Sequence, residues 1–371
     1  MYKKPIQDKE ITKYKRNFYN IYHSRIAPIF SKIETERRKK LTWLVIFLII
    51  AGITLYTIAS IIFSCLFTDH FIALAFCPWF VVLGLMAGYY IITSTNSEFV
   101  KKLKLRCMPE ILKVFNNMKW YDQYNLISDE ELQRSQLFAT YNRRSHYDSF
   151  KGTYNDVNFE IEETVMQHET GSSKNRTVVN IFRGVIIKVP ANKNVKNTTI
   201  IATKTDKNIR NRNVSIWIIA IYSIADITLR FSFSLKTIAI LAVIVLAIIF
   251  ASKFFFSNEQ EKLNEIKLED PEFSKKYRAY SSDQVEGRYL ITPAFMERFK
   301  NLQTAFGSKN AKCSFYGDNL VFAISTNKNL FEIGNLFHSI ENPKQMTEFF
   351  NELSSILALI DYFKLNEKTG L

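Results

Sequence analysis

Two long apolar runs near the N-terminus decide the fold of this chain. They are Thr42–Phe67, TWLVIFLIIAGITLYTIASIIFSCLF, and Phe71–Thr93, FIALAFCPWFVVLGLMAGYYIIT. Each holds more than the roughly 20 apolar residues that an α-helix needs to cross a bilayer. Between Leu41 and Thr93 the chain has one Asp and no Lys or Arg. The runs therefore predict a transmembrane hairpin joined by the short link Thr68–His70.

Basic residues predict the orientation of this hairpin. Residues 1–40 contain 12 Lys or Arg against 4 Asp or Glu, and four more Lys or Arg follow the second run within residues 101–106. Flanks rich in Lys and Arg stay on the cytoplasmic side, so both ends of the hairpin are expected there, with Thr68–His70 outside. Because about 40 polar and basic residues precede the first run, the N-terminus is not expected to be a cleavable signal peptide.

The charge balance is strongly basic, with 49 Lys and Arg against 35 Asp and Glu and a net charge of +14. More than half of the excess lies in residues 1–40, beside the first apolar run. We interpret it as membrane flanking and attraction to anionic lipid headgroups, and expect no nucleic-acid partner.

The sequence contains no recognisable catalytic, cofactor or metal motif. GxGxxG, Walker A, GxSxG and HExxH are absent, the five His residues are scattered, and the four Cys residues form no CxxC. Cys65 and Cys77 lie in the apolar runs, whereas Cys107 and Cys313 are far apart in the sequence. We therefore predict no catalytic, cofactor-binding or metal-binding residue and no cofactor.

Two features beside the apolar runs have alternative interpretations. Phe18–Lys40 predicts a helix with an apolar stripe, kinked or restarted at Pro28. It lies either on the membrane surface or against the protein's own domain. Gly84-Leu-Met-Ala-Gly88 allows close helix packing, and we expect it against the first run of the same chain rather than in a dimer.

The remaining sequence predicts a mixture of helices and strands. Phe99–Trp120 is expected to continue as an amphipathic helix. Strands are predicted at 158–165 and 177–189, joined as a hairpin by 168–176, at 198–202, and at 312–316 and 320–324 around Gly317-Asp-Asn319. Short helices are predicted after the caps Asp270-Pro271 and Thr292-Pro293 and at Asp283–Leu290, and a final helix after Asn342-Pro343.

A second apolar zone, Val214–Phe256, separates these elements into two groups. Leu235–Phe256 is long enough to span a bilayer, whereas Val214–Leu229 is marginal and contains Asp226. Because a single crossing would leave the two groups on opposite sides, we prefer four crossings in total. Asp226 would then be an intramembrane acid near the end of its run, where snorkelling to the interface is the preferred account.

Four stretches of the sequence are distinctive: 127–138 with Tyr141, Asn180-Ile-Phe-Arg-Gly-Val185, Leu268-Glu-Asp-Pro-Glu-Phe273 and 280–298. They resemble the bacterial DUF3137 family of membrane-anchored proteins of unknown function. The N-terminal basic helix and first hairpin are also similar, while the apolar zone within 204–256 departs from the family pattern. The resemblance implies one cytoplasmic domain on both sides of that zone and no known activity, cofactor or substrate.

The densest group of charges is a candidate interaction or structural cluster. Its members are Arg183, Glu269, Asp270, Asp283, Glu286 and Arg288. Arg183 lies in an otherwise apolar strand, which predicts a buried guanidinium paired with one of the carboxylates. A salt bridge between helix and sheet is the preferred interpretation, and a ligand or catalytic pocket is the alternative.

The expected fold is an α-helical multi-pass membrane protein with a cytoplasmic α+β domain, an antiparallel sheet plus helices, split by a second transmembrane hairpin. Its segments are a basic cytoplasmic amphipathic helix (1–40), a transmembrane hairpin (41–94), a helix and β-rich half-domain (95–213), the second hairpin (214–256) and a helix-rich α/β half-domain (257–371).

The expected function is that of a binding module. The chain would sit in the bacterial inner (plasma) membrane with both termini cytoplasmic and bind a protein, a second copy or anionic lipid headgroups, in envelope maintenance or signalling. A membrane-bound enzyme using Arg183 with Asp270, Asp283 or Glu286, and a small transporter using Asp226, are the alternatives.

Overall fold

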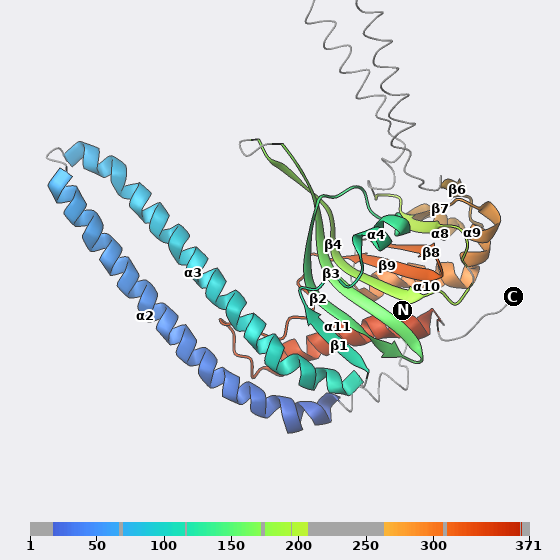
Figure 1. The fold of residues 1–371 in the computed structure, drawn as a ribbon, viewed down its shortest axis with the longest axis horizontal. Coiled ribbons are helices and arrows are strands. Elements are labelled where there is room, and N and C mark those ends of the chain that lie inside the picture. The colour runs from blue at the N-terminus through green and yellow to red at the C-terminus, as the bar shows by residue number, and fades with distance from the viewer. Residues whose placement is uncertain are drawn as a thin grey trace, which may run out of the picture. The chain divides into compact units, whose positions relative to one another are not determined.

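The computed structural model describes residues 18–66, 70–115, 117–171, 175–193, 195–206, 263–306, 310–363 and 365. The chain forms two compact units: unit 1 is Met1–Trp120 with Leu330–Ser354, and unit 2 is Tyr121–Asn329 with Ser355–Leu371. Figure 1 labels their elements. The expected second hairpin at 214–256, with Asp226, and the first 17 residues of the chain lie outside the described residues.

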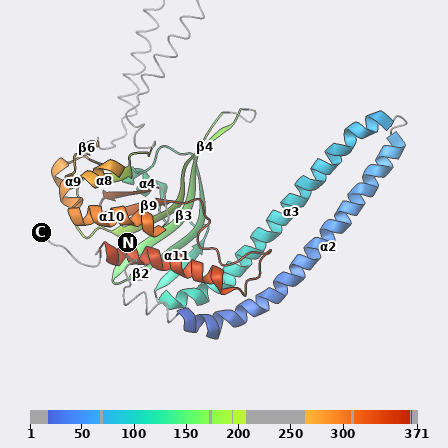
Figure 2. The same cartoon turned by 180° about the vertical axis from the view of Figure 1, so that it is seen from behind.

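Unit 1 is built around two long antiparallel helices, α2 (Ala27–Leu66) and α3 (His70–Leu112), which lie side by side (Figures 1 and 2). A π-helical turn, η1 (Tyr22–Ile26), precedes α2, and the Ala27 N–H donates to the Tyr22 carbonyl. Pro28 has no N–H for an ordinary helical bond, and the wider turn just before it accommodates this loss. The predicted irregularity at Pro28 is therefore a π-turn rather than a break.

The apolar stripe of the first helical segment packs against unit 1 itself. Phe18, Ile26, Phe30 and Ile33 are buried, and the Phe18 ring stacks on Phe350 with centroids 4.5 Å apart. Of the two interpretations of this helix, the structure confirms packing on the protein's own domain.

The two glycines of the GxxxG motif face α2 of the same chain. A Cβ added at Gly84 would lie 3.7 Å from Leu55 Cδ1, and one at Gly88 would lie 4.0 Å from Leu48 Cδ2. The intramolecular interpretation of this motif is confirmed.

The helix predicted over Phe99–Trp120 is wrong at its C-terminal end. Helix α3 ends at Leu112, the 3₁₀ turn η2 (Lys113–Phe115) follows, and Met118 begins strand β1 (Met118–Asp122). Phe115 and Met118 are both buried. Their spacing of three residues suits one more helical turn, but a 3₁₀ turn followed by a strand buries the same pair.

Unit 2 contains an antiparallel sheet, so the α+β class is confirmed. Within the described residues the sheet has nine strands in the order β1-β2-β3-β4-β9-β8-β5-β7-β6, and the neighbouring pairs from β2 to β6 are antiparallel. The strands after β1 are β2 (Arg143–Tyr154), β3 (Val157–Thr170), β4 (Thr177–Pro190), β5 (Thr199–Thr203), β6 (Asn264–Ile266), β7 (Tyr277–Ser281), β8 (Ala311–Tyr316) and β9 (Asn319–Ser325).

Both predicted hairpins are present in this sheet. Strand β3 pairs with β4, and β8 pairs with β9 around Gly317 and Asp318, whose φ values of +48° and +62° suit a two-residue hairpin turn.

Close packing constrains β4 at Gly184, where φ is +153° and an added Cβ would lie 2.1 Å from the Ile324 carbonyl oxygen. Only glycine fits this position without a shift of the backbone.

The three predicted short helices are present. Asp270 caps α8 (Pro271–Lys276), Asp283 caps α9 (Gln284–Leu290), and Thr292 accepts the Phe295 N–H at the start of α10 (Pro293–Phe306). Two further helices are α4 (Asp129–Ser135) and α11 (Pro343–Tyr362). The division between the units falls inside α11, after Ser354.

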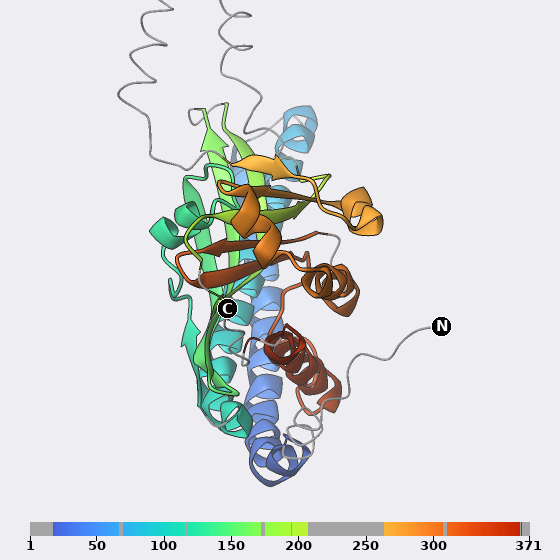
Figure 3. The same cartoon turned by 90° about the vertical axis from the view of Figure 1, so that its right-hand side faces the viewer.

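The central strands of unit 2 are buried on both faces. Successive residues of a strand point to opposite faces, so Tyr316 and Val321 join the cluster of Leu132 and Leu137 around α4. Phe315 and Phe322 instead contact Phe295 of α10 and Phe363. In Figure 3, α4 lies on one side of the sheet and α10 on the other.

The strands on either side of the 207–262 segment belong to one sheet. Thr199–Thr203 and Asn264–Ile266 both pair with β7. The two expected half-domains therefore both contribute strands to one sheet, while 95–120 and 330–354 belong to unit 1.

Candidate functional site

The predicted charge cluster is dispersed in the structure. Asp270 accepts the N–H groups of Glu272 and Phe273 at 2.8 and 3.1 Å and binds Lys300 Nζ at 2.9 Å. Asp283 accepts the N–H groups at the start of α9. Both carboxylates are thus helix caps.

The remaining members are also separate. Arg183 is exposed rather than buried and donates to Asn329 Oδ1 at 2.7 Å. Glu286 accepts the backbone N–H groups of Lys196 and Asn197 at 2.6 and 2.9 Å, which ties that loop to α9. Glu269 and Arg288 are exposed. Arg183 therefore does not lie in a shared pocket with the carboxylates, and the described contacts of Asp270, Asp283 and Glu286 are structural.

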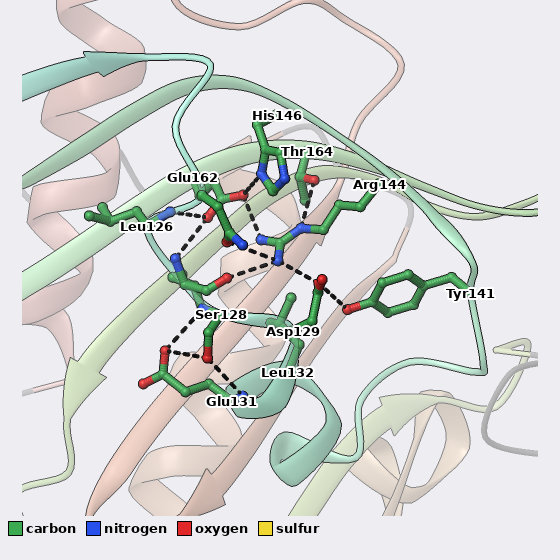
Figure 4. Close-up of polar contacts among 12 residues, drawn as sticks. Leu126, Ser128, Asp129, Glu131, Leu132, Tyr141, Arg144, His146, Glu162 and Thr164 are labelled. Atoms are coloured by element: carbon green, nitrogen blue, oxygen red, sulfur yellow. Dashed lines mark hydrogen bonds and ion pairs between the residues drawn. The ribbon is translucent and has the colours of Figure 1, made fainter.

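A different polar cluster lies where β2, β3 and the loop before α4 meet, and its centre is Glu162 (Figure 4). The Glu162 side chain is fully buried, and its Oε2 accepts the backbone N–H groups of Leu126 and Ile127 at 3.2 and 2.9 Å. Its Oε1 contacts Arg144 Nη2 at 2.5 Å and His146 Nδ1 at 2.7 Å. A carboxylate has about four acceptor positions, and these four contacts fill them.

Arg144 extends this cluster to α4. Its side chain is 3% exposed, and its Nη1 donates to the Ile127 carbonyl at 2.8 Å and to Asp129 Oδ1 at 2.9 Å. Tyr141 Oη donates to the same Asp129 oxygen at 2.7 Å. Burial raises the pKa of the Asp129 carboxyl, but the hydrogen bonds from Tyr141 and Arg144 outweigh burial and leave that pKa below its usual value.

This cluster fastens the 123–128 loop and the start of α4 to the sheet. The capping box of Ser128 and Glu131 completes the attachment. Sequence reasoning did not find this cluster. The alternation Arg144-x-His146 on one strand and Glu162-x-Thr164 on the next is the signal that points to it.

The helix pair of unit 1 carries a second feature, an extended apolar surface. Large apolar side chains between Trp43 and Ile61 on α2 and between Val82 and Tyr90 on α3 are exposed, by 39% at Ile46 to 76% at Tyr56. Such a surface is far larger than the isolated exposed residues that are normal for a soluble monomer.

This apolar surface ends at charged residues that lie at the same level on both helices. Lys40 Nζ lies 3.4 Å from Glu98, which also binds Lys102 Nζ at 2.6 Å, and Arg106 binds Glu36 at 2.8 Å. We call these five residues the collar. On the other side of the collar, Phe30 and Ile111 are 1% and 0% exposed.

One helix in the described part of the chain, Phe18–Ile61, is long and apolar enough to cross a membrane. Only 6% of its most apolar window is buried, which distinguishes it from the core helix of a soluble protein.

The side chains of residues 62–81, including Cys65 and Cys77, are not described, whereas Cys107 and Cys313 are free and buried. Among the described residues, no group of three His, Cys, Asp or Glu side chains is placed to hold a metal ion.

Comparison with known proteins identifies one family. The family model described as a protein of unknown function, DUF3137, matches residues 180–365. No curated protein and no solved structure matches the chain.

Proposed function

The chain belongs to the DUF3137 family, and on that premise we propose that it is a membrane-anchored binding module rather than a catalyst. In this proposal α2 and α3 form a transmembrane hairpin, and the unit that contains the nine-stranded sheet works on the cytoplasmic side. The family description names no activity, so the proposal rests on the residues of this chain.

The observation that carries the proposal is the abrupt change in exposure at the collar. On one side, apolar side chains such as Ile50 and Leu85 face outward and are 56% and 69% exposed, while on the other the apolar stripe is buried. From Leu41 to Leu66 the helix rises about 39 Å, which exceeds a hydrocarbon core of roughly 30 Å. A bilayer covers such a surface without any protein partner.

The charges near the collar support the orientation. Basic residues outnumber acidic ones on both helices beside the apolar surface, within 32–40 and 98–113, as expected for a cytoplasmic flank. Arg38 and Lys102 have side chains that are 68% and 62% exposed. Their positions suit anionic lipid headgroups, which are the ligand class we propose for this surface.

The single sheet of unit 2 supports an even number of crossings. Because β5 and β6 belong to one sheet, both ends of the segment between them lie on the same side of any membrane. We therefore extend the proposal to a multi-pass protein of the bacterial inner membrane with both termini cytoplasmic, acting in envelope maintenance or signalling. A protein partner or a second copy bound to unit 2 would be compatible with this arrangement.

The anchoring proposal is tested with a matched pair of charge substitutions. Ile50→Lys/Ile53→Lys places two charges on the apolar surface, each of which costs about 2.5–3.5 kcal/mol at the centre of a transmembrane helix. The control, Leu105→Lys, changes a side chain that is also exposed, by 52%, but lies within the collar, next to Arg106.

We expect the native chain and the control to stay in the membrane pellet after alkaline carbonate extraction. The pelleted fraction of the double variant should fall several-fold. Release of the native chain by carbonate would show that its apolar surface is covered by protein and would overturn the proposal.

A further inference from the structure

A loop distant in sequence is docked on the helix pair of unit 1 beside the collar. It comprises Gly334–Ile340, between β9 and α11, and Figures 1 and 2 show its trace running along α3. The loop has one large exposed apolar side chain, Phe337, which is 45% exposed and is followed by exposed His338 and Ser339.

The contacts of the loop define its path along the helices. Gly334 lies against Leu103, where an added Cβ would come within 2.9 Å of Leu103 Cδ2. Two residues later, the Leu336 N–H donates to Asn96 Oδ1 at 2.9 Å. Seven residues of helix, or roughly 10 Å of rise, separate Leu103 from Asn96, so the loop runs toward the apolar surface.

The loop then turns and runs back. The Leu336 carbonyl accepts a hydrogen bond from Arg37 Nη1 at 2.7 Å, and the Ile340 N–H donates to Glu34 Oε2 at 3.2 Å. Glu34 is farther from the apolar surface than Arg37. The tip at Phe337–Ser339 is therefore the part of the loop nearest to the apolar surface.

The tip has a fixed conformation that presents Phe337. Asn335 Oδ1 accepts the N–H groups of Phe337 and His338 at 3.0 and 2.9 Å. Asn96 is only three residues, or roughly 5 Å of helix rise, from the end of the apolar run at Thr93. The headgroup layer adds roughly 5–7 Å on each side of the hydrocarbon core, so the tip lies at the depth of that layer.

We propose that the Phe337 tip is a membrane-contact site, in which the aromatic ring enters the headgroup layer beside the helix pair. The occupant is the lipid interface itself, because the tip is continuous with the surface that the bilayer covers. Aromatic side chains are enriched at this depth. The inference rests on the proposed anchoring function. It adds to the membrane contacts of α2 and α3 a third one, made by the tip, which no transmembrane sequence pattern predicts.

The test compares three single-cysteine variants carrying the environment-sensitive fluorophore NBD. They are Tyr56→Cys within the apolar surface, Phe337→Cys at the tip and Leu105→Cys within the collar, next to Arg106, each in a full chain whose native cysteines are replaced. The proteins are reconstituted into phosphatidylcholine vesicles with one quarter phosphatidylglycerol. Quenching is measured with lipids that carry a nitroxide at a shallow or a deep acyl position.

We expect position 56 to be quenched most by the deep nitroxide and position 337 most by the shallow one. Shallow quenching at 337 should be at least twofold stronger than at 105. Asn96→Ala, which removes the acceptor that holds Leu336, should weaken quenching at 337 but not at 56.

The two proposals fail separately in this experiment. If 56 is quenched and 337 behaves like 105, the tip does not contact the membrane and the anchoring function stands. If 56 is not quenched by either lipid, the anchoring function itself is wrong.

Discussion

Glu34 joins the 334–340 loop to helix α2. Its side chain is 3% exposed and accepts hydrogen bonds from Arg37 Nη2 at 2.6 Å, Arg38 Nε at 2.9 Å and the Ile340 N–H. The hydrogen bond from Arg37 is the main reason that the pKa of Glu34 falls from 4.5 to about 2, against the opposing effect of burial. Glu34 therefore holds unit 1 together through its charge.

The first prediction concerns the pH dependence of this contribution. As the pH falls, an unfolded Glu34 takes up its proton first, so its stabilisation is complete above pH 4.5 and is lost between pH 4.5 and about 2. This pKa difference corresponds to a contribution on the order of 3 kcal/mol at neutral pH. Glu34→Gln should lose that amount at pH 7, and its difference from the native chain should vanish near pH 2.

Thiol exchange at Cys107 measures this effect inside unit 1. Cys107 is 1% exposed, so its thiol reacts only when the surrounding part of unit 1 opens. In a chain whose other cysteines are replaced, the rate of reaction with a disulfide reagent that is active at low pH therefore measures the free energy of this opening. The control is Glu36→Gln, which removes an exposed pair with Arg106 and should cost less than about 1 kcal/mol. If the difference in opening free energy between Glu34→Gln and the native chain does not change with pH, the lowered pKa of Glu34 is contradicted.

Single residues also mark the limits of sequence reasoning. Asp270 was identified correctly as a cap because a cap depends on the next two or three residues alone. Arg183 was expected to be buried because its neighbours are apolar, but that side chain is on the exposed face of β4. Glu162 and Arg144 meet across 18 residues of sequence, and only the register of β2 with β3 brings them together.

At the scale of elements, the cluster around Glu162 joins α4 and its preceding loop to the sheet. The second prediction follows from the burial of its charges. Glu162→Gln keeps the shape of the side chain but leaves Arg144, 3% exposed, without its closest carboxylate. We expect a loss of about 3–5 kcal/mol in the free energy of unfolding, as is typical of a broken buried ion pair.

Hydrogen exchange at the Leu126 and Ile127 amides locates this effect, because both N–H groups donate to Glu162. Their exchange should accelerate in Glu162→Gln. A matched control on the same strand, Glu169→Gln, removes pairs with the exposed Arg143 and Arg176 and should leave both amides unchanged. Unchanged protection in Glu162→Gln would show that the cluster does not hold the loop.

The elements that sequence reasoning missed are those with weak patterns. Strand β2 begins with the polar residues Arg143–His146, and β1 continues the spacing of a helix, so neither gives a clean alternation. The hairpins β3–β4 and β8–β9 were found because their strands are apolar and their turns contain glycine. Apolar periodicity therefore predicted the centre of the sheet but not its polar edge.

At the scale of the whole molecule, the two apolar runs predicted the helix pair. The position of the collar, where the exposed apolar surface of that pair ends, required the structure. The level at which Lys40 meets Glu98 depends on how α2 and α3 pack, and the position of the Phe337 tip depends on contacts nearly 300 residues apart in sequence. The α+β class and the joining of the two half-domains into one sheet were both expected from the sequence. The central claim is that this helix pair crosses a bilayer twice and leaves both of its ends on the cytoplasmic side.

One measurement tests that claim most directly: labelling of single cysteines by a membrane-impermeant thiol reagent, in right-side-out and inverted vesicles. The positions are Asp69→Cys in the link between the runs, Leu105→Cys within the collar and Val285→Cys on unit 2, where the native side chain is 80% exposed. We predict labelling at 69 only in right-side-out vesicles and at 105 and 285 only in inverted ones. Labelling of 69 and 105 from the same side would contradict the transmembrane hairpin.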